Sequence, residues 1–302
     1  MGRGTYSDIP KHLGAATRLI AMRLADQTYG TGSTFERLAI ESVLYQKFFV
    51  ITGLWSDGHK LDFDFDTSFG RRAELLLERS IVFPGQSYSM NSPILGVPIP
   101  LFRLIVTLKQ VYQGAIPHRR TILAEIRNEV QSWEAVVLCN KEIDVLSDAE
   151  QPNHRHSYYK GATYLYVLIV SLLFEQSIEA QTLYDAGSRD RFDPGSKSPR
   201  IARVDSWQIQ KAIQILKGYE QDDGWASCFI GNWPVYTIGF FMSRQEDVEL
   251  TRRELHKRWD LTRFNQVARF INDVELTWAE RKLLNRGWEP VGRCRSASQL
   301  PP

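Results

Sequence analysis

Cysteine is scarce in this sequence of 302 residues, which contains only Cys139, Cys228 and Cys294. An odd number of isolated cysteines argues against a disulfide framework and against a thiolate zinc site, because both need paired cysteines. The sequence also has no zinc-cluster or zinc-finger pattern that would deliver a helix to the major groove of DNA. We therefore expect a reducing, intracellular compartment, no metal and no direct binding of nucleic acid.

The chain also lacks an excess of charge of either sign. Its 37 Lys and Arg stand against 35 Asp and Glu, which gives +2 at pH 7. A charge this small draws the whole chain neither to phosphate nor to anionic lipid. The first residues have none of the basic and apolar regions of a secretory signal. These observations predict a nuclear or cytoplasmic protein.

No hydrophobic run in the sequence is long enough to cross a membrane. The most apolar stretch, from Tyr164 to Phe174, is interrupted by Ser171 and falls well below the ~18 residues that a membrane helix needs. We interpret this stretch as part of a buried helix, and we expect no membrane partner.

Catalytic motifs with a fixed local spacing are missing as well. The sequence has no Gly-x-Ser-x-Gly elbow, no phosphate-binding loop ending in Gly-Lys-Ser/Thr and no dinucleotide-type glycine triplet. His154 and His156 have no third ligand at a suitable spacing, so we interpret them as exposed or capping histidines. We expect no cofactor. A triad assembled from residues far apart in the sequence remains open, and so does the question whether the protein is an enzyme.

One acidic pattern begins like a calcium loop but does not continue as one. Asp62, Asp64 and Asp66 have the alternate spacing of the first ligands. Thr67 stands where the loop needs Gly, and Ala73 stands where it needs a bidentate Glu. We interpret the pattern as a solvated extended segment without a metal.

Aromatic residues, in contrast, are abundant, at 12% of the sequence with 8 Trp, 12 Tyr and 15 Phe. A folded chain normally buries side chains of this size. Apolar positions recur at helical spacing in most segments. We therefore predict an all-α fold, an array of antiparallel helices packed around one large core, with long irregular loops.

Local signals give the expected bounds of the helices. Residues 33–36 (Ser-Thr-Phe-Glu) have the form of a capping box, and the apolar stripe that follows predicts a helix over 34–52. The helices over 101–113 and 119–138 are expected to pack as a neighbouring antiparallel pair, and residues 55–66 are expected to be extended. The remaining helices are predicted over 70–79, 157–180, 205–219, 227–242 with a break at Pro234, 245–258 and 262–285.

The predicted helices form one domain over residues 1–286. Within it, residues 185–203 are predicted to be a flexible loop, because Gly and Pro recur there among charges and apolar residues are few. Residues 287–302 are predicted to be a disordered tail.

The most unusual local feature is the segment 231–236 (Gly-Asn-Trp-Pro-Val-Tyr), which lies inside an apolar, helix-like stretch. Pro234 removes a backbone donor and breaks the preceding turn, which leaves carbonyls near Trp233 free. One interpretation is a kinked core helix. The other is a pocket for an apolar small-molecule metabolite, because aromatic side chains provide contact area and a few polar groups orient a ligand. Such a pocket would be lined by Phe229, Trp233, Tyr236, Phe240 and Trp259.

Several of these segments, taken in order, resemble landmarks of a known family, the fungal-specific transcription factor domain of zinc binuclear cluster regulators. The landmarks are residues 11–16 (Lys-His-Leu-Gly-Ala-Ala), residues 91–102 with Asn-Ser-Pro-Ile-Leu-Gly-Val-Pro, residues 158–173, and residues 233–239 (Trp-Pro-Val-Tyr-Thr-Ile-Gly). Residues 244–278 are similar to the closing helices of that domain. The resemblance spans nearly the whole chain.

The resemblance implies an all-α array of antiparallel helices with a regulatory role. In that family a zinc cluster at the N-terminus binds DNA, and the helical domain senses ligands or partners. Residues 11–16 resemble a landmark that normally lies well inside the domain. We therefore expect the cluster, the linker and the early helices to be missing here.

Three functional hypotheses follow from the sequence. In the first, the chain regulates transcription of a fungal specialised-metabolite gene cluster through contacts with a ligand, a protein partner or a second copy of itself. In the second, the same scaffold serves as a cofactor-free cyclase or pericyclase, which needs no nucleophile and no metal because it orients an apolar substrate by shape. In the third, the chain is an inactive, truncated regulator.

Overall fold

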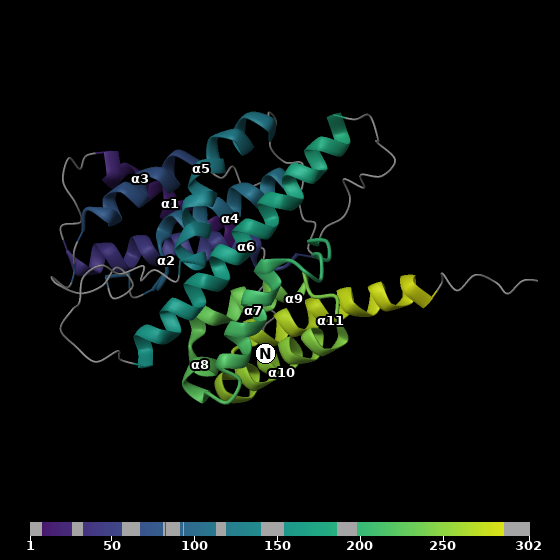
Figure 1. Ribbon diagram of the computed structural model, residues 1–302. Coiled ribbons are helices and arrows are strands. Elements are labelled where there is room, and N and C mark those ends of the chain that lie inside the picture. Colours follow the sequence, from purple (N-terminus) through teal and green to yellow (C-terminus); the bar gives the residue numbers. More distant parts are fainter. Residues whose placement is uncertain are drawn as a thin grey trace, which may run out of the picture.

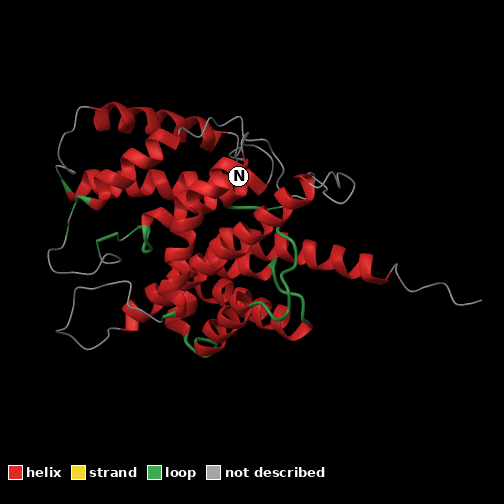
Figure 2. Cartoon of the chain, turned by 45° about the horizontal axis from the view of Figure 1, so that its top comes forward, coloured by secondary structure: helices red, strands yellow, loops and turns green. Residues whose placement is uncertain are grey.

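The computed structural model describes residues 8–25, 33–55, 67–80, 82, 91–92, 94–112, 119–139, 154–185 and 198–286. These residues form eleven α-helices and one short 3-10 helix, and no strand occurs among them (Figure 2). The prediction of an all-α fold with one large core is confirmed.

The N-terminal part contains α1 (Asp8–Ala25), α2 (Thr34–Thr52), α3 (Thr67–Glu78), α4 (Ile99–Tyr112) and α5 (Arg119–Leu138). The bounds of α2 and α5 agree with the predicted ones. Ser33 caps α2, because its hydroxyl accepts a hydrogen bond from the backbone N–H of Glu36 at 3.2 Å. The sequence did not predict α1. Leu19 and Met22 on this helix are 69% and 68% exposed, so its apolar residues do not mark one buried face.

The long helix α6 (His154–Asp185) crosses the molecule between the N-terminal helices and the C-terminal ones (Figure 1). Residues 161–174 are buried on every side of this helix, as expected for a helix that is apolar all round. Its segment Ser157–Thr182 has the length and apolarity of a membrane span, but 89% of the most apolar window is buried inside the protein. It is the central helix of the core.

The expected antiparallel pairing of α4 with α5 is wrong. Each of these helices packs mainly along α6 instead. The link between them is polar, since Arg103 on α4 bonds Glu129 on α5 at 2.7 Å and also bonds Glu74 on α3 at 2.8 Å. A short connection thus placed two helices near one another, while the apolar surface of a third helix determined what they pack against.

The C-terminal part contains α7 (Trp207–Gly218), α8 (Asp223–Ser227), η2 (Phe229–Gly231), α9 (Asn232–Gly239), α10 (Gln245–Thr262) and α11 (Asn265–Arg286). All eight residues of α9 are buried, because α6, α10 and α11 surround it. The carbonyls at its C-terminal end are bonded by side chains of α11. Trp278 donates to the carbonyl of Gly239 at 3.0 Å, and Arg281 donates to that of Phe240 at 2.6 Å.

The predicted break at Pro234 occurs earlier in the chain. The helix before it ends at Ser227, Cys228 is extended with φ −75° and ψ 108°, and the 3-10 turn η2 leads into α9. Pro234 lies in the first turn of α9, where its missing N–H has no helical acceptor to bond. Proline is therefore compatible with the start of this helix and does not kink it.

Part of the segment predicted as a flexible loop is attached to the helices. The amide of Gln176 on α6 bonds both backbone groups of Arg200, at 2.7 and 3.1 Å, and the N–H of Ala202 donates to the carbonyl of Phe241 at 3.0 Å. Residues 198–203 thus run along the core as an ordered connection. The rest of the predicted loop, 186–197, and the predicted tail, 287–302, lie outside the described residues.

Candidate functional site

Trp233, the centre of the predicted pocket, is a core residue with no exposed surface. Its indole ring stacks on Tyr166 of α6, with centroids 5.2 Å apart and planes at 28°. Its Nε1–H donates to the carbonyl of Thr52 at 3.1 Å, which pairs a backbone group that the end of α2 leaves without a helical partner. Both the apolar and the polar parts of this side chain are therefore matched inside the protein.

Tyr236 belongs to a buried polar cluster that joins three elements. Its hydroxyl donates to the carboxylate of Asp273 on α11. The backbone N–H of Trp55, just after α2, donates to the same carboxylate at 3.0 Å. Burial, and next the neighbouring Asp273 charge, raise the pKa of Tyr236 well above its ordinary value, so its phenol stays protonated. The cluster connects α2, α9 and α11.

The other three predicted residues differ from one another in burial and in contacts. Phe240 is also fully buried and packs edge-on against Tyr236, with ring centroids 5.1 Å apart. Phe229 is half-buried, and its ring centroid lies 6.1 Å from that of Tyr45 on α2. Trp259 is half-buried on α10, with the guanidinium of Arg263 5.5 Å from its ring centroid. At Trp233, Tyr236 and Phe240 the contacts correspond to the core-helix interpretation, in which aromatic residues fill the interior.

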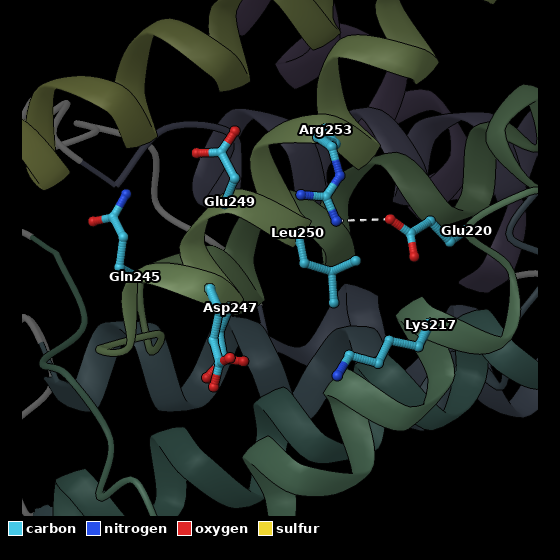
Figure 3. Close-up of a pocket in the computed structure, with 8 residues that line it drawn as sticks. Lys217, Glu220, Gln245, Asp247, Glu249, Leu250 and Arg253 are labelled. Atoms are coloured by element: carbon cyan, nitrogen blue, oxygen red, sulfur yellow. Dashed lines mark hydrogen bonds and ion pairs between the residues drawn. The ribbon is translucent and has the colours of Figure 1, made fainter.

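Open space occurs at the surface in a groove between α7 and α10, with a volume of about 630 Å³ (Figure 3). We call it the α7–α10 groove. Arg253 and Glu220 form an ion pair of 2.7 Å beside it, and Leu250 points into its middle. Its lining consists of Lys217, Glu220, Gln245, Glu246, Asp247, Glu249, Leu250 and Arg253.

The lining of the α7–α10 groove is predominantly acidic, with four carboxylates and two cations. Two of these carboxylates, Glu246 and Asp247, occupy the first turn of α10, where the partial positive charge of a helix N-terminus stabilises anions. Arg244 pairs with both of them from just outside the helix. Glu249 pairs with Arg252 and Glu220 with Arg253, so the groove has Leu250 at its centre and a charged rim in which each carboxylate is ion-paired.

Sequence reasoning missed this groove because its charges are separated along the chain. Lys217 ends α7 and the acidic residues begin α10, and each set taken alone is typical of a solvated helix end. A signal was present in the acidic first turn of α10, but nothing in the sequence shows which helix end faces it.

Metal-binding groups do not gather at any point in the part of the chain that the structure describes. No group of three or more His, Cys, Asp and Glu residues is placed to hold a metal there. His154 and His156 lie in the first turn of α6. Asp62, Asp64 and Asp66, together with the expected extended residues 56–66, lie outside the described residues.

No family model matches this chain, and neither a curated protein nor a solved structure is significantly similar to it.

Proposed function

We propose that this chain is a helical regulatory protein of transcription, acting in a fungal specialised-metabolite gene cluster through a protein partner bound in the α7–α10 groove. The groove carries this proposal, since it is a surface site of about 630 Å³ with Leu250 at its centre and a rim of charged residues. A partner segment with an apolar anchor and flanking charged side chains would be complementary to it.

The resemblance of the landmark segments supports the regulatory assignment, and these segments contact one another in the core. Gly96, from residues 91–102, lies against Tyr159 of α6 and Ile230 of η2. Trp233, from residues 233–239, stacks on Tyr166 of α6. Three segments far apart in the sequence thus form one packing unit, which is what a shared domain scaffold requires.

The buried aromatic residues support regulation over cyclisation. A cyclase that orients an apolar substrate needs a cavity of the size of that substrate, with side chains that reach it. Trp233, Tyr236 and Phe240 have no exposed surface and contact other core residues. Their area is already used for stability.

Deletion of the gene, followed by transcript and metabolite profiling, tests the proposal. We expect the transcripts of the surrounding cluster to fall together and its end product to disappear. Unchanged transcripts with an accumulated uncyclised intermediate would contradict the proposal in favour of a cyclase. Unchanged transcripts with unchanged metabolites would contradict it in favour of an inactive product.

Complementation of the deletion strain tests the groove itself. The double variant Glu246→Lys, Glu249→Lys reverses two charges of the rim, and we expect it to accumulate as a folded protein without restoring the transcripts. The matched control, Asp260→Lys with Glu280→Lys, reverses two exposed carboxylates that do not line the groove and should restore them. Equal complementation by both variants would show that the rim does not bind the partner.

A further inference from the structure

A second cleft lies on the side of α7 that faces α6. It has a volume of about 370 Å³, within the range of roughly 300–1,000 Å³ typical of ligand sites. We call it the α6–α7 cleft. Its lining consists of Lys160, Gly161, Tyr164, Lys211, Gln214, Ile215, Gly218 and Tyr219.

The described residues that line this cleft include two lysines and neither Asp nor Glu. Lys211 on α7 donates a hydrogen bond to the amide oxygen of Gln214 at 3.2 Å, and this neutral acceptor does not neutralise the ammonium charge. Lys160 on α6 lies over the ring of Tyr164, with its Nζ 5.9 Å from the centroid. Both lysines are half-buried, so their charges are partly shielded from water.

Tyr219 forms a rigid wall of the cleft. Its hydroxyl donates to the carbonyl of Ser157 at 2.8 Å, and its ring stacks on Trp225, with centroids 4.7 Å apart and planes at 20°. The ring also lies directly against the backbone of Gly161, where a Cβ atom would come within 2.8 Å of it. Because the Tyr219 side chain is already fixed, it loses no conformational entropy when a ligand binds, and this favours affinity.

Gly218, the last residue of α7, lines the cleft. A Cβ atom at Gly218 would meet no atom within 4 Å, and this residue is exposed. The cleft is therefore open to solvent at this end, and a side chain placed at residue 218 would occupy it without displacing other atoms.

We propose that the α6–α7 cleft binds a small organic anion, a carboxylate or sulfonate carried on an aromatic or alicyclic body. The ammonium group of Lys211 pairs with the anion, while Tyr164, Ile215 and Tyr219 cover the apolar body. The ligand that the proposed regulatory protein senses would thus bind in this cleft. Its regulatory meaning rests on the proposed function, whereas binding is a property of the purified chain.

Titration of the purified protein with 8-anilinonaphthalene-1-sulfonate, an aromatic sulfonate that fluoresces in apolar sites, tests this site. We expect saturable binding that 1-naphthoate displaces. Lys211→Gln should weaken binding about tenfold by removing a charge-assisted contact. Gly218→Phe should weaken it by a similar factor because the ring fills the open end.

Two controls make the outcome decisive. Lys282→Gln removes the same charge from an exposed position of α11 that does not line the cleft, and it should leave the affinity unchanged. The uncharged analogue N-phenyl-1-naphthylamine should bind at least about tenfold more weakly than the sulfonate. Circular dichroism on each variant verifies that it is folded.

Several results would overturn the site. These are wild-type affinity in folded Lys211→Gln and Gly218→Phe, an equal loss in Lys282→Gln, or equal binding of the neutral analogue. Each of them can occur while deletion of the gene still silences the cluster, so failure of the ligand site is distinguishable from failure of the regulatory role.

Discussion

At the scale of single residues, the structure gives polar contacts to the side chains that the sequence suggested for ligand binding. Trp233 and Tyr236 are typical of a pocket when only their types and spacing are known. In the structure, however, the indole N–H bonds a helix-terminal carbonyl and the phenol bonds Asp273. Sequence patterns reveal which residues are amphipathic, but whether their polar atoms meet a ligand or another residue depends on contacts across about 180 residues, such as that between Thr52 and Trp233.

Tyr236 provides a pH-dependent prediction. Its folded-state pKa is raised above the ordinary value by burial and by Asp273. Below about pH 10 the phenol is protonated in both the folded and the unfolded state, and its contribution to stability is complete. Above that pH only the unfolded state releases the proton, so this contribution is lost as the pH rises. We expect the free energy of unfolding to fall above pH 10. In Tyr236→Phe this fall should be shallower by about 1.4 kcal/mol per pH unit.

Urea denaturation of both proteins between pH 8 and about 11 measures the difference, read from the slopes because the substitution also removes a hydrogen bond. Tyr158→Phe is a useful comparison, since the pKa of Tyr158 is also raised, chiefly by its hydrogen bond with Asp222, at a partly exposed position. Identical slopes for wild type and Tyr236→Phe would contradict the prediction.

At the scale of elements, Arg37 of α2 joins three segments through one buried guanidinium. It pairs with Glu41 at 2.8 Å, donates to the carbonyls of Leu77 at 2.8 Å and Ser80 at the end of α3, and reaches the hydroxyl of Ser92 at 3.0 Å. Its exposed fraction is 1%. The side chain therefore sets how α3 and the residues before α4 sit on α2.

Removing one partner of this ion pair should be costly. Arg37→Met leaves the Glu41 carboxylate buried without its cation, and we expect a loss of about 3–5 kcal/mol of unfolding free energy. The double variant Arg37→Met, Glu41→Leu should recover part of this loss, because no unpaired charge remains. Urea unfolding of the three proteins checks the order, and a double variant less stable than the single one would contradict it.

Two glycines, one in the loop before α4 and one at the end of α7, should respond in opposite ways to alanine. Gly96 has φ +63°, and a Cβ atom there would lie 1.8 Å from the side chain of Ile230, so Gly96→Ala should destabilise the fold by about 2–4 kcal/mol. Gly218 ends α7 in open space, and Gly218→Ala should stabilise it by about 0.5–1 kcal/mol. Thermal unfolding compares them, and equal midpoints would contradict both expectations.

At the scale of the whole molecule, the sequence predicted the helices better than their arrangement. The capping box and the apolar stripe gave the bounds of α2, since both signals lie within the helix itself. The pairing of α4 with α5 was wrong because α6 offers apolar surface on all sides, and such a helix attracts any neighbour. The two clefts were missed for a related reason. Their walls are helix faces and helix ends that meet only after folding.

The two clefts share one wall. Lys217 of α7 faces the α7–α10 groove, while Lys211, Gln214 and Gly218 of the same helix line the α6–α7 cleft. Their occupants would meet across a helix of 12 residues. Any shift of α7 that one occupant favours changes the affinity for the other, and thermodynamic linkage makes the factor equal in both directions. A ligand that strengthens the binding of a protein partner would itself be held more tightly by the assembled complex.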